Sequence, residues 1–144
     1  MEVKIRKATE KDAKKIADLA CQMGHSMTEA EAKERVTSID RQKDYNLLFV
    51  AEEDSNILGF VSVYITDEIL NGPQARIGGL VVDSNARGKG VGRILMTAAE
   101  DWAKEKGSQT MKLSSSMERV EAHKFYEKIG YTKSKEQAAF KKTL

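Results

Sequence analysis

The chain has 144 residues, of which 40% are hydrophobic and 32% are charged, and its formal net charge is +2. This length suits one domain over residues 1–144 with a core large enough to stand alone. The near balance of 24 basic and 22 acidic residues argues against a general nucleic-acid binder. No segment is long and apolar enough to cross a membrane. The single cysteine excludes an intrachain disulfide and a cysteine-rich metal site, so we expect a metal-free protein of the reducing cytoplasm.

Apolar residues recur at strand or helix spacing along the whole chain, and turns and capping residues separate the segments. Thr9 is placed to cap the first helix, and Thr28 forms a capping box with Glu31 before the second. In chain order, the predicted elements are a strand at 1–7, helices at 10–23 and from Thr28 to Asp40, strands at 47–53, 57–66 and 75–82, a helix at 90–106, a strand at 110–114, a helix at 118–129, and strands at 131–135 and 138–142. This order predicts a mixed α/β domain in which four helices flank a sheet of six to seven strands, with a parallel pair in the unit 75–114.

The most informative segment joins the strand at 75–82 to the helix at 90–106. It reads Arg87-Gly88-Lys89-Gly90-Val91-Gly92-Arg93. A glycine-rich loop at a helix N-terminus leaves backbone N–H groups unpaired, and the helix dipole favours an anion beside them. The three basic side chains add positive charge at the same place. The segment therefore predicts a phosphate-binding loop.

Two familiar nucleotide loops do not fit this spacing. A triphosphate loop needs serine or threonine after its lysine, but Gly90 follows Lys89 and the upstream glycine is missing. A dinucleotide fingerprint needs glycines spaced as Gly-x-Gly-x-x-Gly and an acidic residue at the end of the next strand. The glycines here are Gly88, Gly90 and Gly92, and the acidic residue is absent.

The pattern over 87–92 instead resembles the coenzyme A pyrophosphate loop of the GNAT superfamily of N-acetyltransferases. A second segment is similar to that superfamily's Ala-x-x-Phe-Tyr-x-x-x-Gly-Phe/Tyr signature, and it runs from Ala122 through Phe125 and Tyr126 to Gly130 and Tyr131. The order of the elements also matches over essentially the whole chain. The resemblance implies the GNAT fold, with acetyl-CoA as co-substrate. Residues 113–131 are loosely similar to bacterial acetyltransferases of aminoglycosides and aminoalkylphosphonates.

The resemblance also implies where acetyl-CoA would bind. Its pyrophosphate would lie on the backbone amides of residues 87–92, and its pantetheine arm would pair with the backbone of Leu80, Val81 and Val82. The pair Gly78-Gly79, which is unusual inside a strand, would allow a bulge that opens a slot beside the strand at 110–114. A hydroxyl of the serine run 114–116, assigned to Ser115, would reach the pantetheine or the pyrophosphate.

Acetyl transfer from a thioester to an amine sets three chemical requirements. A primary amine with a pKa near ~10 is only about 0.1% neutral at pH 7, so it must lose a proton before attack. The carbonyl oxygen that gains charge needs a donor, for which the backbone N–H of Val82 is the candidate. The resemblance implies that Tyr126 serves the departing thiolate. Full proton transfer from a tyrosine to a thiolate is uphill by about 2 kcal/mol, so hydrogen bonding and concerted transfer are both open.

The general base stays unassigned, because the strand segment 74–82 carries no acidic side chain. Asp67, Glu68, Glu29 and His25 are the candidates, and a base acting through water is equally compatible. The predicted activity is acetylation of a primary amine, of a small molecule in the first instance, by direct attack in a ternary complex. The alternatives are a protein N-terminal or lysine acetyltransferase and an acyl-CoA sensor without turnover. Dimers are common in this fold, but no feature of the sequence specifies a homodimer.

Overall fold

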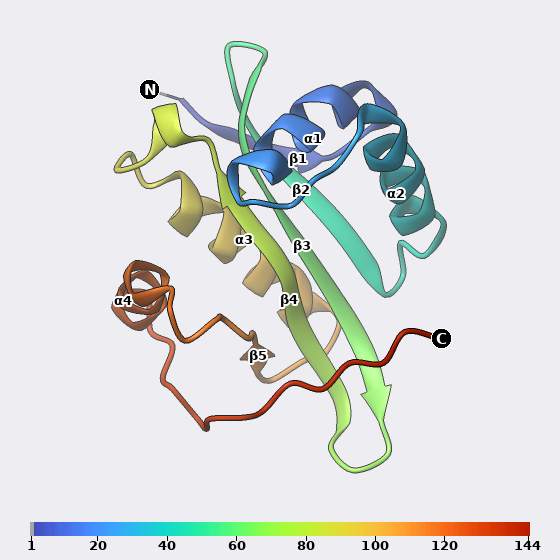
Figure 1. The fold of residues 1–144 in the computed structure, drawn as a ribbon, viewed down its shortest axis with the longest axis vertical. Coiled ribbons are helices and arrows are strands. Elements are labelled where there is room, and N and C mark those ends of the chain that lie inside the picture. Colours follow the sequence, from blue (N-terminus) through green and yellow to red (C-terminus); the bar gives the residue numbers. More distant parts are fainter. Residues whose placement is uncertain (1) are drawn as a thin grey trace. The chain divides into compact units, whose positions relative to one another are not determined.

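The computed structural model describes residues 2–144. The chain forms two compact units, Met1–Leu113 and Ser114–Leu144. The first unit contains β1 (Lys4–Lys7), the 3-10 helix η1 (Glu10–Asp12), α1 (Ala13–Gln22), α2 (Glu29–Arg41), β2 (Asn46–Glu53), β3 (Asn56–Glu68), β4 (Gly72–Val82), the 3-10 helix η2 (Ser84–Ala86), α3 (Val91–Glu105) and β5 (Met111–Lys112) (Figure 1). The second unit contains α4 (Val120–Lys128). The α/β class and the four α-helices are as predicted.

The first unit is built on one sheet in the order β1-β2-β3-β4-β5. The first four strands run antiparallel, and β4 pairs with β5 in parallel, as the strand–helix–strand unit predicted. The strands β2 and β3 form a hairpin, with Asp54 and Ser55 at φ +49° and +67° in its turn.

The prediction of six to seven strands is wrong, because the sheet has five. The segments 131–135 and 138–142 were expected to be its last strands, but they form no strand, and residues 132–144 are exposed. Each segment carries one large side chain, Tyr131 or Phe140, among lysines and small residues, which is too little apolar surface to bury a face. Strand propensity is expressed only where a segment finds both a pairing edge and a packing surface.

Helices cover both faces of the sheet in the first unit. The helices α1 and α2 pack on one face, where the apolar cluster includes Ile16, Leu19, Val36, Val50, Phe60 and Val81. The helix α3 packs on the other face against β2, β3 and β4 (Figure 1). Its buried side chains are Val91, Leu95, Met96, Ala99 and Ala103. Helices therefore cover both faces of β4, the strand that leads through η2 to the glycine-rich loop.

Gly59 of β3 lies where the backbone of β4 comes closest. A Cβ at this position would lie 2.5 Å from the carbonyl oxygen of Val81 and 3.2 Å from the side chain of Leu95. We expect Gly59→Ala to lower the free energy of unfolding by about 2 kcal/mol, because neither β4 nor α3 can retreat without disrupting the core. Urea unfolding checks this. Gly79→Ala is the matched control, since a Cβ there meets nothing within 4 Å; equal losses in the two variants would contradict the close approach.

The start of α1 is fixed by a buried carboxylate. Both carboxylate oxygens of Asp12 accept from Arg6 at 2.9 Å, and the backbone N–H of Thr9 donates to Asp12 at 2.8 Å. Arg6 also donates to Glu52 on β2 at 3.0 Å. The hydrogen bonds from Arg6 lower the pKa of Asp12 below its usual value of 3.8.

This pKa shift predicts how stability depends on pH. Because the pKa of Asp12 is lower in the folded state, the carboxylate stabilises the fold above its unfolded pKa and loses that contribution as pH falls through the folded value. We expect Asp12→Asn to be less stable than the wild type by about 2 kcal/mol at pH 7. The difference should stay constant down to about pH 5 and shrink below about pH 4. Urea unfolding across this range checks it, and a pH-independent difference would contradict the assignment.

Candidate functional site

The strand β4 has an open edge beside β5. It pairs along its length with β3, but with β5 only at two residue pairs, the last of which involves Arg76. The register of the β3–β4 pair shifts between Ser62 and Val63, so Gly78 is the extra residue of a bulge. Within the described residues, no strand pairs with the outer edge of β4 after Arg76. The bulge and the early end of the β4–β5 pairing agree with the slot expected from Gly78-Gly79.

The backbone groups of Leu80 and Val82 point to this open edge. The N–H of Asp83 donates to the carbonyl of Leu58 on β3 at 2.8 Å. Amide directions alternate along an antiparallel strand, so Val81 also faces β3, whereas the N–H and C=O of Leu80 and Val82 face away from it. An extended ligand that carries amides can therefore pair with Leu80 and Val82, while the backbone of Val81 is used within the sheet.

The loop after β4 presents backbone donors at the start of α3. Gly88 and Gly90 both have φ +80°, and a Cβ on either would meet no protein atom within 4 Å. Among the described residues, no backbone N–H from Arg87 to Arg93 donates a hydrogen bond within the protein, and the first such bond of the helix is from Ile94 to the carbonyl of Gly90. The loop is thus a run of free donors at the positive end of a 15-residue helix.

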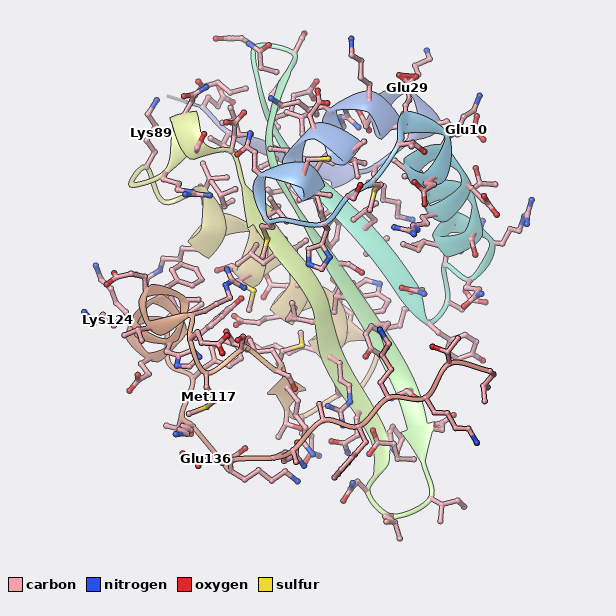
Figure 2. The ribbon with its side chains drawn as sticks, viewed as in Figure 1. Glu10, Glu29, Lys89, Met117, Lys124 and Glu136 are labelled. Atoms are coloured by element: carbon pink, nitrogen blue, oxygen red, sulfur yellow. The ribbon has the colours of Figure 1, made fainter. Side chains whose placement is uncertain are left out.

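Positive side chains surround these donors. Arg87, Lys89 and Arg93 are exposed, and no ion pair engages them in the part of the chain that the structure describes (Figure 2 shows Lys89). Val91, in contrast, is 1% exposed and anchors the loop in the core, so it can contribute only its backbone N–H. Free donors, a helix N-terminus and unpaired cations together suit an anion such as a pyrophosphate.

Sequence reasoning missed a buried acid at the join between β4 and this loop. Asp83 is 7% exposed and accepts from Lys15 at 2.8 Å, from the N–H of Asn85 at 3.1 Å and from Gln22 at 3.4 Å. The hydrogen bond from Lys15 is the main reason that the pKa of Asp83 lies below its usual value. The amide oxygen of Gln22 accepts from the N–H of Ser84 at 2.9 Å. The one signal in the sequence is an acid placed directly before a basic loop.

The bulge is lined by two residues that the sequence did not single out. A Cβ at Gly78 would lie 3.1 Å from the hydroxyl oxygen of Ser62 and 3.5 Å from the ring of Tyr64. Phe60, Ser62 and Tyr64 are every second residue of β3, so their side chains share one face of the sheet. Phe60 belongs to the core on the face that α1 and α2 cover. Hydroxyl groups of β3 therefore lie beside the bulge of β4, on one face of the sheet.

Two base candidates lie at the far end of the β3–β4 hairpin. Glu68 accepts a hydrogen bond from Asn71 at 3.0 Å and another from Arg76 at 2.9 Å. Both bonds lower the pKa of Glu68, and the bond from Asn71 has the larger effect. A carboxylate held in its charged form is a weak proton acceptor. Asp67 pairs in register with Pro73, about 13 Å along the strand from the bulge at 3.3 Å per residue. The backbone positions of both residues are therefore distant from the bulge at Gly78.

The other two base candidates belong to the α1–α2 region. Glu29 is the first residue of α2, and Figure 2 shows it on the opposite side of this unit from Lys89. His25 is exposed in the segment between α1 and α2. The structure thus does not bring the four candidates together at one place.

The second unit holds Tyr126 on α4. Its ring makes edge-to-face contacts with Phe125 at 5.2 Å and with Tyr131 at 6.0 Å between centroids. Burial raises the pKa of Tyr126 above its usual value of 10.0, and the charge of Arg119 opposes this in part. In the same unit the Ser115 hydroxyl is buried and has no hydrogen-bond partner among the described atoms. The phenol of Tyr126 therefore stays protonated at neutral pH, as a hydrogen-bond donor must.

Two broader findings concern residues 2–144 as described. No three His, Cys, Asp or Glu side chains are grouped so as to hold a metal ion. None of the helices has both the length and the apolar character needed to cross a membrane.

An open strand edge near a cationic loop of free amides suits an extended, amide-bearing anion. Comparison with known proteins identifies the group to which the protein belongs. The profile of the Acetyltransferase (GNAT) family matches residues 10–131. The chain belongs to this family, which makes it an acetyl-CoA-dependent N-acetyltransferase.

Individual relatives agree with this assignment. The uncharacterized N-acetyltransferase YhdJ of Bacillus subtilis is 35% identical over 63% of this chain, and the match spans 65% of that protein, just under two thirds of its length. An aminoglycoside N(6')-acetyltransferase type 1 of Stenotrophomonas maltophilia is 26% identical over 97% of this chain and 93% of its own. The crystal structure of glucosamine-6-phosphate N-acetyltransferase from Arabidopsis thaliana superposes with a TM-score of 0.84 at 30% identity, covering 98% of this chain and 99% of that one.

Proposed function

We propose that residues 1–144 act as one catalytic domain that transfers the acetyl group of acetyl-CoA to the primary amine of a small molecule, by direct attack in a ternary complex. The observation that carries this proposal is the set of unengaged amides over 87–93, which follows the open edge of β4 after the short helix η2. A pyrophosphate and an amide-bearing arm require these two features side by side.

Three sets of residues are proposed to contact acetyl-CoA. The amides of residues 87–92 would hold the pyrophosphate, with Arg87, Lys89 and Arg93 compensating its charge. The backbone of Leu80 and Val82 would pair with the pantetheine amides. In the second unit, Ser115 has a buried hydroxyl without a partner, and it is retained as a further contact.

The bound co-substrate supplies an acetyl group activated as a thioester. The N–H of Val82 is the proposed donor to the carbonyl oxygen that gains negative charge during attack. Tyr126 is the proposed donor to the sulfur that departs. Its pKa is raised further by burial, which favours a hydrogen bond to the thiolate over full proton transfer. No acidic side chain lies on β4, so the proton of the attacking amine is taken by a group outside this strand, either water or one of the base candidates, with the general base left unassigned.

A small-molecule acceptor is supported by what two relatives are named for. One is named for aminoglycosides and the other for glucosamine 6-phosphate, and both names describe amines on small polar molecules. The alternatives within the class are the N-terminus or a lysine of a protein. A sensor that binds acyl-CoA without turnover is the alternative outside it.

The test is a thiol-release assay with acetyl-CoA and a panel of amines. The panel contains aminoglycosides, amino sugar phosphates, aminoalkylphosphonates, polyamines and short peptides. We expect turnover with a small-molecule class and none with peptides. Turnover on peptides alone would favour the protein acceptor. Absence of turnover throughout, together with tight acetyl-CoA binding by calorimetry, would favour the sensor, and absence of binding would refute the assignment of residues 87–92.

A further inference from the structure

The carboxylate of Asp83 is a buried charge between the two parts of the proposed cofactor site. It follows Val82, whose N–H points to the open edge, and it precedes the loop that starts at Arg87. Burying a carboxylate costs several kcal/mol unless it is paired and hydrogen-bonded. Here the pairing comes from α1, a helix 61 to 68 residues away in the sequence.

Two side chains of α1 hold two consecutive residues of the β4–loop junction, Asp83 and Ser84. Lys15 and Gln22 bind the carboxylate of Asp83, and Gln22 also accepts from the N–H of Ser84. The same carboxylate accepts from the N–H of Asn85. The junction is therefore attached through side chains to α1, in addition to its backbone bonds to β3.

The helix α1 is a rigid support for these contacts. Leu19, one turn after Lys15, is 0% exposed, and Ile16 is 5% exposed. Both belong to the apolar cluster that α1 shares with the sheet. A displacement of the Asp83 backbone would therefore have to break charged hydrogen bonds or move a packed helix.

Charge gives the pair a second consequence. Asp83 lies next to a loop that would receive a pyrophosphate, so an unpaired carboxylate there would repel the ligand. The ammonium group of Lys15, at 2.8 Å, cancels that charge. For simple packing, two apolar side chains of similar volume would serve as well or better.

We propose that Lys15, Gln22 and Asp83 are positioning residues, which orient Val82 and the loop 87–92 for acetyl-CoA and keep the junction electrically neutral. This inference rests on the proposed function. It adds a role for α1, a helix that contributes no residue to the predicted cofactor contacts.

Calorimetric titration with CoA tests the proposal at a temperature where every variant is folded. We expect Asp83→Asn to raise the Kd about fivefold through loss of position, and Lys15→Met to raise it about tenfold or more, because it also leaves an uncompensated carboxylate. The double variant Lys15→Met with Asp83→Asn should bind CoA better than Lys15→Met alone, since the repelling charge is gone. A merely structural role would not produce this rescue.

The matched control is Asp12→Asn. Asp12 is another buried aspartate, 6% exposed and paired with Arg6 at 2.9 Å. It should lower the melting temperature and leave the Kd for CoA within about twofold. If the Kd values of Lys15→Met and Asp83→Asn also stay within about twofold of wild type, the positioning role is overturned. The wild-type titration separates this failure from failure of the proposed function, because only the latter predicts that the unmodified protein does not bind CoA.

Discussion

Gly90→Ala is expected to weaken CoA binding by about 10- to 100-fold, measured as Kd by calorimetry. Gly90 has φ +80° and caps the N-terminus of α3. Alanine in this conformation is strained by about 1–2 kcal/mol, so the loop would tend to relax out of its shape. The added methyl group would also project among the free amides where the pyrophosphate is proposed to lie. Loss of one or two charge-assisted hydrogen bonds accounts for the expected range.

The same helix offers the matched control at its other end. Gly107 follows the C-terminus of α3 with φ +91°, and a Cβ there also meets nothing within 4 Å. Gly107→Ala should therefore cost a similar free energy of unfolding and leave the Kd for CoA unchanged. If both variants bind CoA alike, the effect at Gly90 is one of stability, and the loop 87–92 is not the phosphate site.

Tyr126→Phe is expected to lower kcat about 100-fold while leaving the Kd for CoA nearly unchanged. Phenylalanine keeps the edge-to-face contacts with Phe125 and Tyr131 and removes only the hydroxyl. A donor that acts on a departing group contributes typically ~10²–10⁴-fold to the rate and little to ground-state binding. Thiol release at saturating acetyl-CoA and acceptor measures this.

The control for this variant is Tyr131→Phe, in the same aromatic contact. It should retain kcat within a fewfold of wild type. A rate for Tyr126→Phe that is also near wild type would remove Tyr126 from the chemistry and leave only the backbone N–H groups as donors. A large rise in Kd for CoA, in contrast, would mean that the hydroxyl serves binding and not departure of the thiolate.

Local sequence signals predicted most of the fold. The capping box of Thr28 and Glu31 forms as expected. The N–H of Thr28 donates to the Glu31 carboxylate at 3.0 Å, and the N–H of Glu31 donates to the Thr28 hydroxyl at 3.1 Å. The glycine-rich loop does lie between β4 and α3, because positive φ angles and a helix start both depend on nearby residues. The last two predicted strands failed because strand formation depends on partners that the segment itself does not contain.

Along this chain, the sequence by itself determined the order of the elements up to α4, the family and the loop that carries the free amides. These follow from periodicity, capping and glycine spacing, which act within a few residues. Only the tertiary structure decided that Leu80 and Val82, but not Val81, face the open edge, since that depends on the phase of the β3–β4 ladder. It alone placed Lys15 and Gln22 against Asp83. A contact between residues 61 to 68 apart forms when a helix packs on a sheet, and no local pattern in either segment predicts it.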